Sequence, residues 1–212
     1  MKFYINVMIN PTLKVLDYDK RKFLESCMSV KGYSAEVERY RSVLLTGVDD
    51  RNNKQVLTLK GWNARIAQHE MDHLDGKLYI DHMDPSTFHC TCWEQNIRYL
   101  CTTFTKSKSF RQWYRDLWIP DHPCQPPYWH FTQIGDPILR TKASNVPEEA
   151  IKEPEIADFV DQMIKMLRKY NCVGIAAPQI GISLQRKTNL FMIRIGNEFG
   201  VGVGCDREKV MQ

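Results

Sequence analysis

The feature that most constrains this sequence is an H-E-x-x-H pattern at positions 69–73, inside a stretch with helical spacing. We expect a helix over residues 63–75, with Asn63 as its N-cap and Gly76 just past its end. Two histidines one turn apart on a helix can hold a single divalent metal ion while the glutamate between them faces the metal's water. The pattern therefore predicts a buried metal site; the plainer alternative is two hydrogen-bonded histidines on a half-buried helix.

His69 and His73 supply two ligands, and a catalytic metal site needs a third protein ligand beside an open position. The sequence after the helix offers none nearby, because Tyr79 occupies the position where a local third histidine would fall. Cys27 is the natural candidate, since a thiolate binds zinc or ferrous iron strongly and metal binding deprotonates it. A single cysteine is more often a small packed residue, so Cys27 needs independent support.

That support comes from the sequence VGIAAPQIG at 173–181. Small residues let the main chain pass close to another group, and Gln179 is a polar side chain among apolar ones. Its amide can donate a hydrogen bond to an oxygen that develops negative charge. Taken alone, the stretch is more typical of a tight turn between a helix and a strand.

Together, three segments resemble the signature motifs of the peptide deformylase family: ESCMS (25–29), QHEMDH (68–73) and CVGIAAPQ (172–179). Neighbouring sequence, including QIGDPILR (133–140), extends the similarity to about residues 1–95 and 128–195, and it is nearest to the mitochondrial type from animals. Two positions depart from the family pattern. Cys172 replaces the first glycine of the loop motif, and Ser26 replaces the glycine of the cysteine motif, where a required positive φ would strain the turn that aims Cys27.

The motifs also stand in a rotated order. The family runs loop, cysteine turn, metal helix, whereas this chain runs cysteine turn, metal helix, loop. One explanation is a circular permutation, in which residues 96–130 join the old C-terminus to the old N-terminus. The other is a gene model that fuses the rear half of one tandem copy to the front half of the next, which the transit-like composition of residues 97–118 favours.

The resemblance implies a metal-dependent hydrolase that removes the formyl group from the N-terminal methionine of newly made polypeptides, at the ribosome. It implies one metal ion, ferrous iron by family likeness, although spacing alone also admits zinc, cobalt or nickel. The implied metal ligands are Cys27, His69 and His73. The other implied site residues are Glu70 for proton transfer, Gln179 and the main-chain N–H of Met28 for the oxyanion, and Gly174 and Ile175 for substrate contact.

Two other functions stay open. An H-E-x-x-H zinc peptidase would cleave internal peptide bonds and use a third ligand other than Cys27. A non-catalytic or vestigial metal-binding relative would carry the metal without turnover, with Ser26 and the rotated order as the cause.

The expected fold is α+β, with mixed or antiparallel sheets packed around a central metal-binding H-E-x-x-H helix in permuted chain order. Residues 1–95 correspond to the family's C-terminal half and residues 131–195 to its N-terminal half, and we expect them to form one domain. Residues 96–130 form a basic and then proline-rich linker, and residues 196–212 a tail. The expected elements are strands at 3–9 (ended by a turn at Asn10-Pro11), 42–45, 55–59 and 190–195, a hairpin connection at 49–53, and a core helix at 155–170.

Composition limits the partners and the compartment. A net charge of +4 with interleaved signs gives no nucleic-acid stripe, and no apolar run is long enough to span a bilayer. Seven irregularly spaced cysteines favour a reducing compartment over a disulfide framework. The sequence starts with neither a secretory signal nor a transit peptide. We expect a mitochondrial location by resemblance, with the cytoplasm as the alternative, and the oligomeric state stays open.

Overall fold

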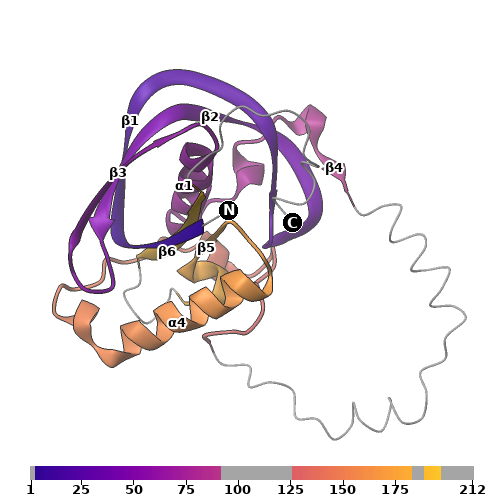
Figure 1. Cartoon of the computed structure of the whole chain (residues 1–212). Coiled ribbons are helices and arrows are strands. Elements are labelled where there is room, and N and C mark those ends of the chain that lie inside the picture. The colour runs from indigo at the N-terminus through magenta and orange to yellow at the C-terminus, as the bar shows by residue number, and fades with distance from the viewer. Residues whose placement is uncertain (1–2, 92–125, 183–188, 197–212) are drawn as a thin grey trace, which may run out of the picture.

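The structure is a computed structural model that describes residues 3–91, 126–182 and 189–196. Most of the expected linker and nearly all of the expected tail lie outside these residues. Within these residues the fold is α+β, with an antiparallel sheet and two α-helices (Figure 1). The strands are β1 (Phe3–Cys27), β2 (Val30–Val48), β3 (Lys54–Lys60), β4 (His89–Cys90), β5 (Gly174–Ala176) and β6 (Leu190–Gly196). The helices are α1 (Gly61–Leu74) and α4 (Pro154–Lys169), with 3-10 turns η1 (Tyr79–Asp81), η2 (Pro85–Thr87), η3 (Pro137–Arg140), η4 (Ala150–Lys152) and η5 (Ala177–Ile180).

The sheet joins strands from both ends of the sequence. Its order is β3-β2-β1-β6-β5, with β4 pairing against β2. β1 pairs with β2 along most of its length, and its first residues pair antiparallel with β6, so that Met8 lies opposite Phe191. β1 and β2 form long curved ribbons that arch over α1 (Figure 1). One sheet therefore contains both of the family-like halves of the chain.

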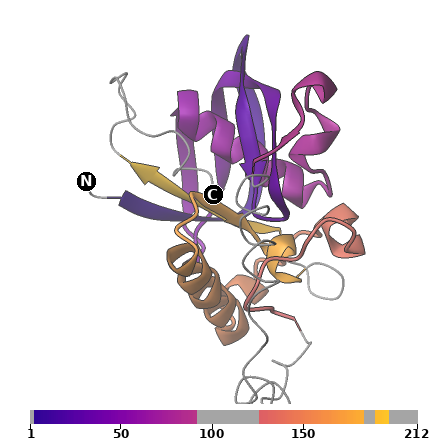
Figure 2. The same cartoon turned by 90° about the vertical axis from the view of Figure 1, so that its right-hand side faces the viewer.

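The alternation of side chains along β6 explains how the two helices are placed. Leu190 and Met192 point into the core cluster that contains the apolar face of α4. Phe191 and Ile193 point into the cluster that contains α1, because successive side chains on a strand face opposite sides. α1 and α4 thus cover opposite faces of this part of the sheet (Figure 2). The strand expected at 190–195 is confirmed.

The helix that carries the H-E-x-x-H pattern begins two residues earlier than expected. α1 follows β3 directly, its N-cap is Lys60, and Gly61 adopts a φ of +58° that lets the chain turn from strand into helix without a loop. The expectation that Asn63 caps the helix is therefore wrong. Gly76 does end it with a φ of +72°, as expected.

β1 is much longer than the expected strand at 3–9. Asn10 has a φ of +50°, and the pairing with β2 shifts register between Ile9 and Thr12. The Asn10 side chain bonds both the N–H and the C=O of Val146, each at 2.8 Å. The Asn-Pro pair therefore forms a bulge inside a continuing strand rather than a turn.

Two further local expectations are confirmed. The connection at 49–53 is a hairpin loop in which the Asp49 carboxylate accepts hydrogen bonds from the N–H groups of Arg51 and Asn53. The helix expected at 155–170 is α4, which buries an apolar stripe of Ile156, Phe159, Val160, Met163, Met166 and Leu167. Among the helices of the described residues, none is long and apolar enough to cross a membrane.

Candidate metal centre and active site

One face of α1 carries the two histidines and the glutamate into the interior. Glu70 and His73 are buried, with exposed fractions of 3% and 1%. The neighbouring Gln68 holds the helix against β2, because its amide accepts from the Tyr40 N–H at 3.0 Å and donates to the Tyr40 C=O at 2.8 Å. These two hydrogen bonds therefore fix the orientation of α1 relative to β2, directly beside His69 and Glu70.

Cys27 lies at the last residue of β1, where the chain turns through Met28 and Ser29 into β2. Ser26, just before it, pairs with Ser34 in the sheet. Among the described non-glycine residues, positive φ angles occur at Asn10, Asn52 and Asn171. Ser26 is not one of them, so the condition under which a side chain there would strain the turn is not met.

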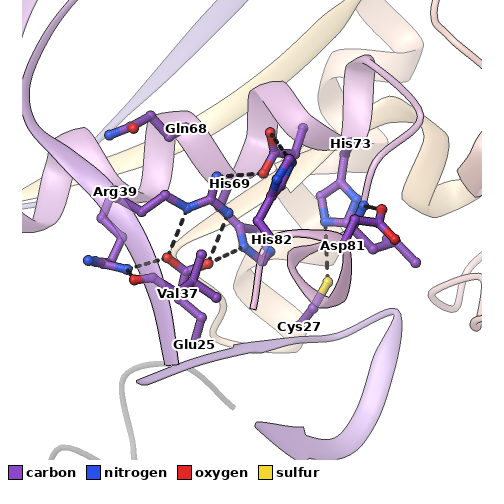
Figure 3. A network of polar contacts seen from close by, with 12 residues as sticks. Glu25, Cys27, Val37, Arg39, Gln68, His69, His73, Asp81 and His82 are labelled. Atoms are coloured by element: carbon purple, nitrogen blue, oxygen red, sulfur yellow. Dashed lines mark hydrogen bonds and ion pairs between the residues drawn. The ribbon is translucent and has the colours of Figure 1, made fainter. Parts of the chain in front are cut away.

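The three expected metal ligands lie together. The ligand atoms of Cys27, His69 and His73 are all within 4.8 Å of one another, and the Cys27 Sγ lies 3.2 Å from His73 Nε2 (Figure 3). The strand end and the helix thus bring a thiol to two imidazoles that are separated from it by more than forty residues. A cysteine and two histidines form a donor set suited to divalent iron or zinc.

A buried carboxylate that the sequence motifs did not predict as a site residue lies behind the cluster. Glu25 accepts hydrogen bonds from Arg39 at 3.1 and 3.0 Å and from Arg65, and it lies 3.2 Å from His69 Nδ1 (Figure 3). A carboxylate on Nδ1 orients the ring and leaves Nε2 as its ligand atom. The available signal was that Glu25 opens the ESCMS motif.

The electrostatics of the cluster favour a thiolate. Burial opposes ionisation of Cys27, but the charge of His73 and hydrogen bonds from both histidines outweigh it and hold the pKa of the thiol well below its usual value. Burial likewise opposes protonation of His69, but bonds to Cys27 and Glu25 raise its pKa well above the usual range. Burial would also raise the pKa of Glu25, yet the bond to His69 and the charge of Arg39 lower it to about 2. The charges around Cys27 therefore favour the thiolate, which is the form of cysteine that binds metal ions.

Glu70 is the opposite case, a carboxyl kept near neutrality. Burial raises its pKa to about 7, although the charges of His69 and His73 act in the other direction. Within the described residues, its Oε2 atom is buried without a hydrogen-bond partner. The carboxyl also packs against Gly174, where an added Cβ would lie 2.2 Å from Glu70 Oε1. A carboxyl with this pKa can both accept and release a proton at neutral pH.

Gln179 reaches the same centre from η5. Its Oε1 accepts the Ala176 N–H at 2.9 Å, which turns the amide nitrogen toward the cluster. That nitrogen lies 3.6 Å from Cys27 Sγ and 3.4 Å from Ser29 Oγ. The fixed amide can donate a hydrogen bond to an oxygen placed beside the thiol.

A pocket opens onto these groups and includes the thiol, Glu70 and Gln179 in its lining. Gly174 also lines it, but the Ile175 side chain is fully buried in the core beside α4. Substrate contact by Gly174 and Ile175 stays a prediction, and for Ile175 the buried side chain leaves the main chain as the group that would make it. Cys172 and Arg65, which were not expected, line the pocket as well. Burial raises the pKa of Cys172 to about 12, so that this thiol stays protonated.

Comparison with known proteins agrees with these motifs. A family model described as polypeptide deformylase matches residues 2–89 and 129–198. Peptide deformylase 1A, chloroplastic/mitochondrial, of Arabidopsis thaliana is 50% identical over 86 residues, which are 41% of this chain and 32% of the relative. The mitochondrial peptide deformylase of Homo sapiens is 46% identical over 91 residues, which are 43% of this chain and 37% of the relative. The chain thus spans about a third of the length of these two curated relatives.

Two solved structures are similar to part of this chain. A peptide deformylase from Synechococcus elongatus in complex with actinonin has a TM-score of 0.37 and 36% identity, and the match covers 38% of this chain and 44% of that one. A Plasmodium falciparum peptide deformylase in complex with an inhibitor has a TM-score of 0.37 and 38% identity, with coverages of 38% and 53%. Because the family model matches well over half of the sequence, the chain belongs to the polypeptide deformylase family.

Proposed function

We propose that this chain hydrolyses the formyl group from the N-terminal methionine of newly made polypeptides. The observation that carries the proposal is the meeting of Cys27 from β1 and Gln179 from η5 over the paired imidazoles of α1. Membership of the family supports it, as does the pocket that opens onto these groups. The formylated peptide is the proposed substrate, presented as the chain leaves the ribosome.

Cys27, His69 and His73 would hold one divalent metal ion. The donor set suits iron, zinc, cobalt and nickel, and we propose ferrous iron as the native metal. When bound, such an ion supplies Lewis acidity that brings the pKa of water down toward neutrality. Glu25 fixes the ring of His69 from behind, and the depressed pKa of Cys27 favours the charged ligand that the ion requires.

The remaining groups handle protons and charge. Glu70 accepts a proton from the attacking water and delivers it to the leaving amine, in keeping with its pKa of about 7. The Gln179 amide and the Met28 N–H donate hydrogen bonds to the oxygen of the formyl group as it becomes negatively charged. Gly174 lets the Glu70 carboxyl lie directly against the main chain of β5, beside the substrate.

We further propose that residues 1–95 and 131–195 form one domain in a circularly permuted order. The pairing of β1 with β6, and the packing of Met8 with Phe191 and Ile193 around α1, support this over a gene model whose halves come from two tandem copies and never shared a fold. A continuous transcript across residues 90–135 is expected. Separate messages for the two sides of this stretch would contradict the permutation.

The compartment is proposed as mitochondrial. Relatives named as mitochondrial or chloroplastic proteins support this location. A fluorescent fusion of the full-length protein that stays in the cytoplasm would contradict it.

The direct test is formate release from formyl-Met-Ala-Ser by the purified chain loaded anaerobically with ferrous iron. We expect turnover, loss of both metal and activity in Cys27→Ala, and loss of activity with retained metal in Glu70→Gln. Cleavage of unformylated peptides by a metal-loaded Cys27→Ala variant would instead identify a zinc peptidase. One equivalent of bound metal without formate release would identify a non-catalytic relative.

A further inference from the structure

The segment of residues 131–134 lies between the two parts of the chain that carry the oxyanion donors. On one side it bonds to the loop that contains Gln179. On the other side it bonds to the turn that contains Met28 and Ser29. The segment itself supplies no proposed catalytic group. It contacts both the loop with Gln179 and the turn with Met28, the two parts of the chain that would bind the formyl oxygen.

The bonds to the glutamine loop come from Thr132, which is only 4% exposed. Its N–H donates to the C=O of Gln179 at 2.8 Å. Its Oγ1 lies 3.2 Å from that same C=O and 3.3 Å from the C=O of Pro178. Thr132 thus holds the main chain of the residue whose side-chain amide points at the thiol.

The bonds to the cysteine turn come from the next two residues. The Gln133 amide donates to the C=O of Met28 at 3.0 Å and to the C=O of Phe131 at 3.1 Å. The Ile134 N–H donates to the C=O of Ser29 at 2.8 Å. The turn from β1 into β2 is therefore anchored to the same short segment as the glutamine loop.

These contacts matter because the two donors come from distant parts of the chain. Across the site, the direct bonds from the Gln179 amide to Cys27 and Ser29 are long, at 3.6 and 3.4 Å. An oxyanion site works only when both donors reach the same oxygen at about 2.7–3.1 Å, so their separation must be held by other contacts. A misplacement of about 1 Å commonly costs on the order of a hundredfold in rate.

We infer that Thr132 and Gln133 are positioning residues, which set the separation between the Gln179 amide and the Met28 N–H. The kinetic test of this inference rests on the proposed deformylase function, because it measures formate release. The spectroscopic test does not depend on that function. Neither residue is among those that line the pocket with the thiol, Glu70 and Gln179.

The first test compares Thr132→Val, which removes the hydroxyl at nearly constant volume, with Thr132→Ser, which keeps it. We expect Thr132→Val to lower kcat about fivefold, the effect of one hydrogen bond, with KM within about twofold and metal content unchanged. Thr132→Ser is expected to match the parent protein. Combined with Gln179→Leu, Thr132→Val should cause no further loss, because it acts through that side chain.

The second test uses Gln133→Glu, because Gln133 is exposed and we expect a substitution there to leave the fold intact. This substitution removes the amide donor and places a carboxylate against the Met28 carbonyl. We therefore expect kcat to fall, as in Thr132→Val. In ¹⁵N spectra, the Met28 and Ser29 N–H signals should shift in Gln133→Glu, and the Gln179 side-chain amide should shift or broaden in Thr132→Val. Signals from α4 serve as the internal control.

Two results would overturn the inference. One is additive losses in the Thr132→Val and Gln179→Leu pair, which would mean that Thr132 acts on something else. The other is an unchanged set of signals for Met28, Ser29 and Gln179 in both variants. If the parent protein releases no formate, the proposed function fails and the spectra alone decide the inference.

Discussion

Replacing Gly174 with alanine tests whether the Glu70 carboxyl depends on the bare main chain of β5. The added Cβ would lie 2.2 Å from Glu70 Oε1 and 2.7 Å from its carboxyl carbon. Gly174 does not have a left-handed φ, so alanine adds bulk without backbone strain. Glu70 is buried and cannot swing into solvent, so the carboxyl must retreat by about 1 Å to reach an ordinary contact distance.

The size of the effect follows from that displacement. A shift of about 1 Å in a catalytic group costs on the order of a hundredfold in kcat, or about 3 kcal/mol of barrier. The overpacked core should also lower the free energy of unfolding by about 1–3 kcal/mol. Steady-state formate release measures the first quantity, and urea unfolding measures the second, both on protein of known metal content.

The matched control is Gly47→Ala, which also crowds its neighbours, since its Cβ would lie 3.0 Å from the Ile9 carbonyl oxygen outside the site. It should cost stability without a selective loss of kcat. In a Glu70→Ala background, the stability cost of Gly174→Ala should disappear because the clashing carboxyl is gone. A kcat within threefold of the parent at full metal content would refute the reasoning, since Glu70 would then not be held against β5.

Four other outcomes are expected. Replacing Glu25 with glutamine should remove about 3 kcal/mol of stability at pH 7, because a pKa that falls from 4.5 to about 2 on folding stabilises the protein above pH 4.5. The parent should lose this term as the pH falls from 4.5 to 2, and urea unfolding of the variant should show a flatter dependence over that window. Gln179→Leu should lower kcat about a hundredfold with little change in KM, measured by formate release. Iodoacetamide at pH 7 should label Cys27 in metal-free protein but leave Cys172 unmodified, because their pKa values shift in opposite directions, and peptide mass spectrometry distinguishes the two. Zinc at a hundred times its Kd should raise the free energy of unfolding by about 3 kcal/mol in the parent but not in Cys27→Ala, as thermal denaturation would show.

The elements that could be predicted from the sequence are those set by local periodicity. α4 repeats its apolar residues at helical spacing, and the loop at Asp49 has the polar composition of a hairpin connection. The grouping of Cys27 with the two histidines came from motif resemblance rather than from any local pattern. The structure places these three side chains together, while their function as ligands stays a prediction.

The features that were missed depend on contacts between distant residues. β1 was expected to end at Asn10, because the bonds that turn this residue into a bulge come from Val146, 136 positions along the chain. The outer part of the ribbon also exposes large apolar side chains, including Tyr18 at 78%, so it lacks the alternation that identifies a half-buried strand. The partners of Glu25 lie on β2 and α1, and a sequence pattern carries no sign of them.

The pairing of Phe3 with Gly196 and of Ile9 with Leu190 sets a limit on how this protein is made. β1 leaves the ribosome about 180 residues before β6, the strand with which it pairs. At translation speeds of about 5–20 residues per second, that delay is about ten to forty seconds. During it, Met8 and the other side chains that should lie beneath β6 stay uncovered, and folding dominated by such distant pairings is slow. A protein proposed to process nascent chains is therefore expected to carry, during its own synthesis, an unpaired strand and uncovered apolar side chains, which are prone to aggregation.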